Sequence, residues 1–501
     1  AVTVVEAAEG PGGKMRCMDS AAGPVDAGPT VLTMRAVFDD LFALAGSRIE
    51  DHLTLHRQQV LARHWWPDGS MLDLSSDAEA SAAAIAAWGG ARAEADFRRF
   101  HARTGAAFAA FDAPVMQAPR IRPAAVARAA LAAPALWPML LPGMTLARYL
   151  ALQFREPRLR QLFGRFATYV GGIPTTAPAV LSLIWQAEAA GVWVVQEGMN
   201  RLAQTLARLA ESGGAQIRYE VSATRILEHW GQVSGVALSD GSSLAAEAVL
   251  FNGDPAALRE GRLGPAVANA VPARGVAPRS LSARVWAFAA SASGLPLLHH
   301  NVIFTADPTQ EFGPLARGQA PRDASLYICA QDRGAGHAPP GNERFEIIMN
   351  APPHRPGAPD PAKEDDRCHQ LMLSTLARAG LTLTPPPAQA TMTTPAMLAE
   401  RFPGSQGSIY GLSPAGLTAS FRRPTALTRL PGLYLAGGGV HPGAGVPMAA
   451  LSGRHAAEAI GRGQIKGGLI SRSRSAPTAM PGGMSTGSKM GAGAPSRSSG
   501  S

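Results

Sequence analysis

Residues 433–451, LYLAGGGVHPGAGVPMAAL, constrain the fold of this chain more than any other stretch. The stretch begins as a short apolar strand, 433–436, and Pro442 and Pro447 then stiffen a turn that leads into a helix predicted over 449–460. Glycine-rich turns between a strand and a helix let backbone N–H groups approach a ligand and point the helix N-terminus at an anion. A purely structural turn is the alternative. The turn is poor in side chains because of Gly437, Gly438, Gly439, Gly443 and Gly445.

The beginning of the chain carries a related pattern. Residues 2–5 predict a buried parallel strand that ends in Glu6, and a Gly-Pro-Gly-Gly turn with Lys14 follows. In a dinucleotide-binding βαβ unit, an acidic residue at the end of the second strand accepts hydrogen bonds from ribose hydroxyls. Residues 25–30, VDAGPT, form another tight turn of small residues, in which Asp26 is expected to act as a cap.

Taken in order, these segments resemble one family, the flavin-dependent carotenoid desaturases of the phytoene desaturase group. Three further segments resemble its substrate domain: 166–174 (FATYVGGIP), 299–304 (HHNVIF) and 348–352 (IMNAP). A fourth matching segment, 419–424 (ASFRRP), precedes the glycine-rich turn. This fourth segment is most similar to the branch that acts on 1-hydroxylated acyclic carotenoids. The resemblance covers about residues 1–462.

The resemblance implies an α/β fold. A Rossmann-like FAD/NAD(P)-binding flavin domain would be assembled from discontinuous segments, with a helical and mixed-sheet substrate domain inserted. The expected parts are a first flavin segment (1–62), a helical membrane or substrate subdomain (63–190), a second flavin segment (191–258), a substrate-domain sheet (259–420), a third flavin segment (421–462) and a disordered basic tail (463–501).

The resemblance also implies FAD as the cofactor. Val221 is expected to meet the adenine through its backbone, and His441 either faces the flavin ring or is a turn histidine held by the backbone. No general base and no metal site is assigned, and His299 and His300 are expected to be buried strand residues. The residues expected to bind the cofactor are Glu6, Gly12, Gly13, Lys14, Gly28, Pro29, Thr30, Val221, Gly437, Gly438, Gly439, His441, Gly445, Val446 and Pro447.

One departure from the family pattern concerns the beginning of the chain. The family opens with a strand and a G-x-G-x-x-G turn whose helix N-terminus holds the pyrophosphate, and no such motif precedes Glu6. Judged from the size of half a βαβ unit, about thirty residues would be absent. We therefore expect a fragment of a longer gene product with weakened flavin binding. A second departure is Glu197-Gly198, where the family usually has two glycines.

Charge and hydropathy bear on the partners. Eight arginines fall between Arg120 and Arg165 against one acid, Glu156, and they flank the apolar run 131–146, which three prolines interrupt. This run is too short and too broken to span a bilayer, so we expect it to lie on an anionic membrane surface. An ordinary helix pair with solvated arginines is the alternative. The three cysteines, Cys17, Cys329 and Cys368, form neither a metal motif nor a disulfide framework, which favours a reduced cytoplasmic protein.

The expected activity is FAD-dependent desaturation of an acyclic carotenoid at a membrane surface, with a C-3,4 double bond formed in 1-hydroxy or 1-methoxy substrates. No nucleic-acid partner is expected. A phytoene desaturase or carotene isomerase of the same family is the first alternative. An inactive remnant that binds no flavin is the alternative from another class.

Overall fold

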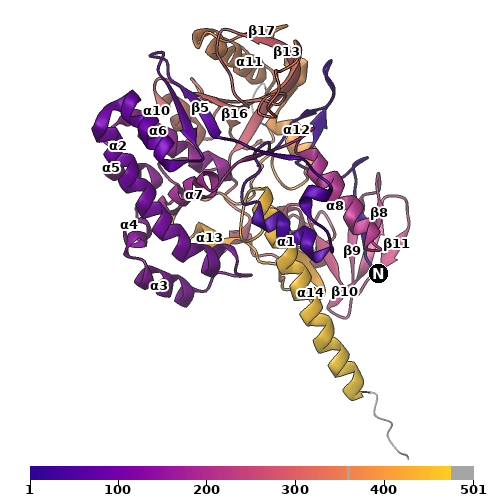
Figure 1. Ribbon diagram of the computed structural model, residues 1–501. Helices are drawn as coiled ribbons and strands as arrows, with labels where there is room; N and C mark the ends of the chain where they lie inside the picture. The colour runs from indigo at the N-terminus through magenta and orange to yellow at the C-terminus, as the bar shows by residue number, and fades with distance from the viewer. Residues whose placement is uncertain (358–360, 475–501) are drawn as a thin grey trace, which may run out of the picture. The chain divides into compact units, whose positions relative to one another are not determined.

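The computed structural model describes the backbone of residues 1–357 and 361–474 and the side chains of those up to 463 (Figure 1). The chain divides into two compact units, residues 1–460 and 461–501. The elements described below belong to the first unit, apart from the end of helix α14.

A mixed eight-stranded sheet forms the centre of the predicted substrate domain. All neighbouring strands are antiparallel except β14 and β5, which pair in parallel with Asn301 opposite Arg63. The mixed sheet is therefore confirmed, and residues 66–70 form the hairpin between β5 and β6. The strand order is β17 (Thr382–Thr384), β13 (Ser282–Ser293), β16 (Glu343–Ala351), β15 (Leu326–Ala330), β14 (His300–Ile303), β5 (Val60–Trp65) and β6 (Met71–Ser75), with β18 (Met392–Thr393) also paired to β13.

The two faces of this sheet have different partners, because successive side chains of a strand point to opposite faces. On one face, Trp286 and Phe345 join a core that helix α11 (Pro361–Arg378) completes with Met372. On the other face, Ala283 and Val285 line the main cavity of the protein. The sheet thus separates a packed core from a ligand space.

A helical layer occupies the region predicted to be helical. Its core is aromatic, with Phe163 stacked on Phe154 at 5.0 Å between ring centroids and Trp185 at the edge of the same ring. The elements are α2 (Ala78–Phe111), η2 (Asp112–Met116), α3 (Pro123–Ala132), η3 (Pro134–Leu136), α4 (Trp137–Leu140), α5 (Leu146–Gln153), α6 (Pro157–Gly164), η4 (Arg165–Val170), η5 (Ala179–Leu183) and α7 (Ile184–Ala189). Within the described residues, none of the helices is by itself long and apolar enough to cross a membrane, and one pair, 123–132 with 134–140, passes that test only together and is bent by 113°.

The remaining strands form small ladders around the glycine-rich turns. Two are parallel pairs, β1 (Thr3–Val5) with β8 (Gln216–Arg218), and β12 (Val249–Phe251) with β19 (Leu433–Leu435). The antiparallel ladders are β9 (Ala223–His229) with β10 (Gln232–Leu238) and β11 (Ser243–Ala245), β2 (Cys17–Met18) with β3 (Val25–Asp26), and β4 (Leu55–Arg57) with β7 (Trp193–Val195).

The other helices connect these ladders to the sheet. The longer ones are α1 (Ala36–Leu44), α8 (Asn200–Ser212), α10 (Pro308–Ala316) and α14 (Val446–Arg474). The shorter ones are α9 (Pro255–Arg259), α12 (Pro395–Arg401), α13 (Ala419–Arg422), η1 (Ile49–Asp51), η6 (Pro265–Val267), η7 (Ala273–Gly275) and η8 (Gln389–Thr391).

Two local predictions need correction. Strand β1 is not buried, since Val2 and Val4 are 62% and 41% exposed and β1 pairs only with β8 in the described chain. Helix α14 runs to Arg474, so the part of the predicted disordered tail up to this residue is helical. The rest of the predicted tail, 475–501, lies outside the described residues.

Candidate functional site

A cavity of about 1850 Å³ lies within residues 1–460. Its wall is built from segments that are far apart in the sequence: the end of β1 and the turn after it, residues 27–33, and the turn between β19 and α14. The structure thus brings together most of the residues predicted to bind the cofactor. Those that line the cavity are Glu6, Gly12, Gly13, Lys14, Gly28, Pro29, Thr30, Gly437, Gly438, Gly439, Gly445, Val446 and Pro447.

Two predicted residues lie outside the lining. The backbone N–H of Val221 donates to the carbonyl of Glu6 at 3.0 Å, so this N–H is already used, although the neighbouring Glu220 and Ser222 do line the cavity. His441 is buried, and its Nε2 lies 2.8 Å from the carbonyl oxygen of Ala118. Of the two alternatives for His441, this contact favours the turn histidine held by the backbone, because a carbonyl of the helical layer engages its side chain.

The turns around the cavity need glycine for space. A Cβ on Gly28 would lie 1.9 Å from the carbonyl oxygen of Lys14, so the two turns can touch only because residue 28 has no side chain. A Cβ on Gly438 would meet no protein atom within 4 Å and would point into open space at the cavity wall. Backbone that approaches a ligand closely has this property.

The helix α14 starts at the cavity. Gly445, Val446, Pro447 and Ala449 all line it. Pro447 has no N–H and the N–H of Ala449 donates to the carbonyl of Gly445 at 2.9 Å, which leaves the N–H groups of Val446 and Met448 without intrahelical acceptors. These free N–H groups and the helix dipole favour a negatively charged group. The strand, turn and helix predicted from 433–460 therefore form one wall of an anion-accepting space.

Glu6, which lines the cavity, and Asp26, which does not, have separate roles. Glu6 follows β1 directly, and its Oε1 accepts the backbone N–H of Ala8 at 2.8 Å, which leaves Oε2 for a ligand hydroxyl. Asp26 was expected to cap a turn, and the structure shows it at the start of α8, where it accepts the backbone N–H of Asn200 at 3.2 Å and that of Met199. Burial raises the pKa of Asp26.

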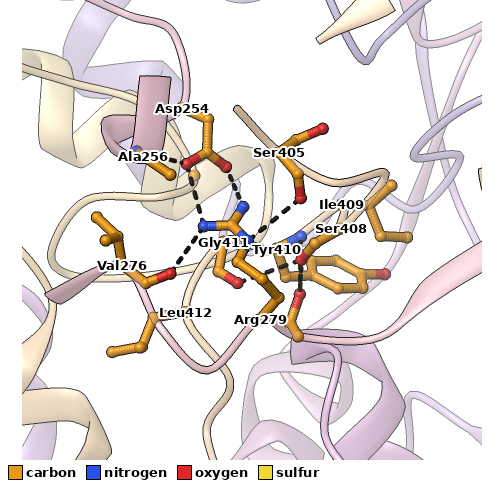
Figure 2. A network of polar contacts seen from close by, with 12 residues as sticks. Asp254, Ala256, Val276, Arg279, Ser405, Ser408, Ile409, Tyr410, Gly411 and Leu412 are labelled. Atoms are coloured by element: carbon orange, nitrogen blue, oxygen red, sulfur yellow. Dashed lines mark hydrogen bonds and ion pairs between the residues drawn. The ribbon is translucent and has the colours of Figure 1, made fainter. Parts of the chain in front are cut away.

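A buried charged network supports the loop at 405–412 (Figure 2). The guanidinium of Arg279 binds both carboxylate oxygens of Asp254 and donates to the carbonyl of Ser405 at 3.2 Å. Arg423 donates to the carbonyls of Tyr410 and Gly438, each at 3.0 Å, so it ties this loop to the glycine-rich turn.

Lys14 extends this network to the cavity wall. Its Nζ donates to the carbonyl of Ile409 at 2.9 Å. Burial lowers the pKa of Lys14 to about 8, with Asp254 opposing the shift and Arg279 and Arg423 adding to it. Lys14 is thus a cation at neutral pH that a bound anion would stabilise.

A further part of the cavity wall carries Tyr327, which was not predicted from the sequence, next to Thr30, which was. The hydroxyl of Tyr327 lies 2.8 Å from Thr30 Oγ1 and 2.7 Å from His300 Nδ1, so these three groups form a hydrogen-bonded chain. Burial and the charges of His299 and Arg165 lower the pKa of His300 well below its usual range. This hydrogen-bonded connection could not be predicted from the sequence, because its three residues come from separate strands and turns.

Three further polar groups line the same wall: Arg165, Tyr169 and Glu188. Arg165 was expected to be one of the arginines that flank a membrane segment. In the structure only 9% of its surface is exposed, and it lines the cavity. Arg165 directly precedes the FATYVGGIP segment, and this position is the one sequence feature that could have indicated a place near the substrate.

His299, His300 and Cys329 gather behind this wall. One ligand atom from each lies within 4.8 Å of the others, and all three residues are buried. The contacts within the protein already engage His299, whose Nδ1 lies 2.6 Å from the carbonyl of Arg333 and whose Nε2 lies 3.4 Å from Cys329 Sγ. The wide sequence spacing of the cysteines gave no hint of this cluster.

Comparison with known proteins agrees with this geometry. Residues 1–461 match the family model for flavin containing amine oxidoreductases. The hydroxyneurosporene desaturase of Cereibacter sphaeroides is 58% identical over 459 residues, and that of Rhodobacter capsulatus is 52% identical; each match covers 92% of both chains. A crystal structure of an oxidoreductase from Methanosarcina mazei has a TM-score of 0.57 at 15% identity, covering 91% of this chain and 94% of that one.

The residues present fit the flavin that this family holds. Glu6 offers a carboxylate oxygen, Lys14 and the start of α14 offer positive charge, and Gly438 leaves room for close backbone approach. In an adenine dinucleotide the ribose hydroxyls would bind the carboxylate and the pyrophosphate would bind the positive charge. The glycine would let the ligand lie close to the backbone. The chain belongs to the flavin containing amine oxidoreductase family, with hydroxyneurosporene desaturases among its relatives, and it is an FAD-dependent oxidoreductase.

Proposed function

We propose that this protein desaturates an acyclic carotenoid of the hydroxyneurosporene type and forms the C-3,4 double bond of a 1-hydroxy or 1-methoxy substrate. The observation that carries the proposal is the continuity of the cavity. It reaches from the glycine-rich turns to the apolar face of the sheet, where Val285, Val302, Phe304 and Ile348 line it. The identity of 58% and 52% to two hydroxyneurosporene desaturases supports the substrate class.

A bound FAD supplies the two-electron oxidation that removes hydrogen from adjacent carbons. The chain supplies the rest. The apolar side chains exclude water and hold the polyene in line, which lowers the entropic part of the barrier. Tyr327 presents a hydroxyl at the cavity wall, and hydrogen bonds with Thr30 and His300 hold this hydroxyl in place.

The protein would meet its lipid substrate as a peripheral protein on the cytoplasmic side of a membrane surface. Leu131, Trp137, Leu141 and Leu152 expose large apolar side chains. Exposed arginines lie on the same elements and between them, namely Arg122, Arg128, Arg148 and Arg155. Apolar side chains that enter the interface, together with basic side chains near anionic headgroups, bind a protein reversibly to a membrane.

The test of the function is an assay of the flavin-loaded protein on vesicles that contain a 1-hydroxylated acyclic carotene, with the product identified by mass spectrometry and NMR. A new C-3,4 double bond supports the proposal. Conversion of phytoene instead would favour the first alternative within the family, and a cis-to-trans change without loss of mass would favour an isomerase. A well-folded protein without a flavin absorption spectrum would contradict the assignment as an enzyme.

A further inference from the structure

A carotenoid is mostly apolar, so a charged side chain is unexpected in the cavity that would bind it, yet Arg165 lies in the wall of this cavity. The residue begins η4, is 9% exposed and lines the cavity together with Tyr169 and Glu188. Burial of a guanidinium is costly unless it is paired and hydrogen-bonded. A polar ligand atom would compensate for this cost.

The contacts of Arg165 leave part of it unsatisfied. Its guanidinium carbon lies 4.9 Å from the ring centroid of Tyr169 and 5.9 Å from that of Phe166, so two aromatic rings make cation–π contacts with the guanidinium. Its Nε is buried and has no hydrogen-bond partner among the described residues. No ion pair to its side chain occurs within 4.0 Å in the described part of the chain either. Buried donors of this kind are rare in native proteins, and a bound ligand explains them.

The neighbouring groups form a polar patch in an otherwise apolar wall. Glu188, in α7, is 6% exposed, and burial raises its pKa, opposed by the charge of Arg165 and a hydrogen bond with Tyr169. His300 also senses the charge of Arg165, which helps to keep it neutral. The patch thus combines one fixed cation with neutral or weakly acidic partners.

Resting on the function proposed above, we propose that Arg165, Tyr169 and Glu188 bind the oxygen at C-1 of the substrate and select oxygenated carotenoids. A guanidinium donates hydrogen bonds and accepts none, so it can bind either a hydroxyl or a methoxy oxygen. A hydroxyl can also donate to Glu188, whereas a methoxy group cannot. Because C-1 is two bonds from C-3, the groups that hold the oxygen also position the bond to be desaturated.

The test compares three substrates on the flavin-loaded full chain in vesicles: a 1-hydroxylated acyclic carotene, its 1-methoxy ether and the same carotene without oxygen. The wild type is expected to prefer both oxygenated substrates. In Arg165→Met, kcat/KM for both should fall about 10- to 100-fold relative to the carotene without oxygen, since a hydrogen bond to a charged group contributes on this scale. Arg165→Lys should restore part of the preference.

A second variant separates the two oxygenated substrates. Glu188→Met removes an acceptor, so turnover of the hydroxylated substrate should fall more than that of the methoxy ether. Tyr169→Phe serves the same comparison with a smaller change in packing. The control is Arg317→Met, which removes an exposed arginine at the end of α10 and should leave all three ratios unchanged.

The possible failures are distinguishable. If the wild type converts none of the three substrates, the function proposed above fails and this proposal fails with it. If the wild type converts all three equally, only the selection of oxygen is overturned. If Arg165→Met lowers all three equally with flavin still bound, Arg165 has a structural role and the proposal is overturned as well.

Discussion

Arg279 and Asp254 form a two-point ion pair in which the two side chains are only 7% and 5% exposed (Figure 2). The same carboxylate caps α9 through the backbone N–H of Ala256 at 2.9 Å. The same guanidinium holds the carbonyl of Ser405, at the start of a loop that reaches the cavity through Tyr410. One ion pair therefore joins a helix start to the wall of the flavin cavity.

Loss of one partner of this pair should be severe. Arg279→Met would leave the Asp254 carboxylate buried without its cation, and the free energy of unfolding should fall by about 3–5 kcal/mol. Thermal unfolding followed by circular dichroism measures the change. The matched control is Arg218→Met, which breaks the half-exposed pair with Asp240 and should cost at most about 1 kcal/mol. Equal losses in both variants would contradict the structural role of the buried pair.

Gly28 offers a test of the contact between two cavity turns. In Gly28→Ala the new methyl group would meet the carbonyl oxygen of Lys14, and the resulting shift should cost about 1–3 kcal/mol and lower flavin occupancy. The ratio of flavin to protein absorbance measures the occupancy. Gly10→Ala, at a cavity position where a Cβ meets nothing within 4 Å, should change stability by less than about 0.5 kcal/mol. A flavin-replete Gly28→Ala protein would refute the close approach.

Lys14 predicts how flavin binding depends on pH. Burial lowers the pKa of Lys14 to about 8 in the free protein, and an anionic pyrophosphate beside it would raise that pKa again. The affinity for FAD should therefore be highest below pH 8 and fall as pH rises above 8, by at most about tenfold per unit. Fluorescence titration between pH 7 and 9.5 measures it. Lys14→Met should bind FAD more weakly but without this dependence; a flat profile for the wild type would exclude Lys14 from the anion site.

Three buried histidines predict instability in acid. Burial lowers the pKa of His299 to about 4, and burial with neighbouring charge lowers those of His300 and His64 well below the usual 6.5. The unfolded chain therefore binds more protons than the folded chain below pH 6.5, so stability is lost as pH falls towards 4. Each imidazole should contribute up to about 1.4 kcal/mol per pH unit.

Urea unfolding at several pH values between 4 and 7 measures this slope. His299→Gln should make the free energy of unfolding depend less steeply on pH, because one fewer imidazole takes up a proton on unfolding. This holds even if the variant is also less stable at pH 7. A pH-independent unfolding midpoint would mean that these imidazoles are not held neutral in the folded protein.

The exposed apolar side chains of the helical layer predict membrane binding. Replacement of both Leu131 and Trp137 by alanine should weaken binding to anionic vesicles about tenfold or more. Burial of each side chain in the interface should contribute about 1–3 kcal/mol to the free energy of binding. Co-sedimentation at two salt concentrations measures it. Trp230→Ala, which removes an even more exposed tryptophan from the turn between β9 and β10, is the control. Equal loss in the control would show that the helical layer has no special role.

The features that could be predicted from the sequence are those with local causes. The strand, turn and helix around Gly438 were predictable because glycine, proline and apolar periodicity act within a few residues. The mixed sheet was expected from the resemblance to a known family and not from local pattern, since apolar strands do not by themselves reveal how they pair. Neither the exposure of Val4 nor the contact of His441 with Ala118 was predictable, because both depend on which distant segments lie alongside.

The polar wall of the cavity illustrates the same limit. Arg165 looked like one of several solvated arginines, since charge and spacing do not reveal whether a side chain is covered. Its neighbours Glu188 and Tyr327 are 23 and 162 positions further along the chain. Only the fold brings these three residues to one cavity, and no local pattern encodes that meeting.

The distant origin of the cavity walls has a consequence for biosynthesis. Residues 5–33 and 437–449 border the same space, so a growing chain cannot complete its flavin site until nearly all of it has been made. Contacts of such long sequence separation form slowly, and partly folded chains are exposed to proteases and aggregation meanwhile. Because a ligand stabilises only the state that binds it, the supply of flavin at the moment of release from the ribosome should set how much of the newly made protein survives.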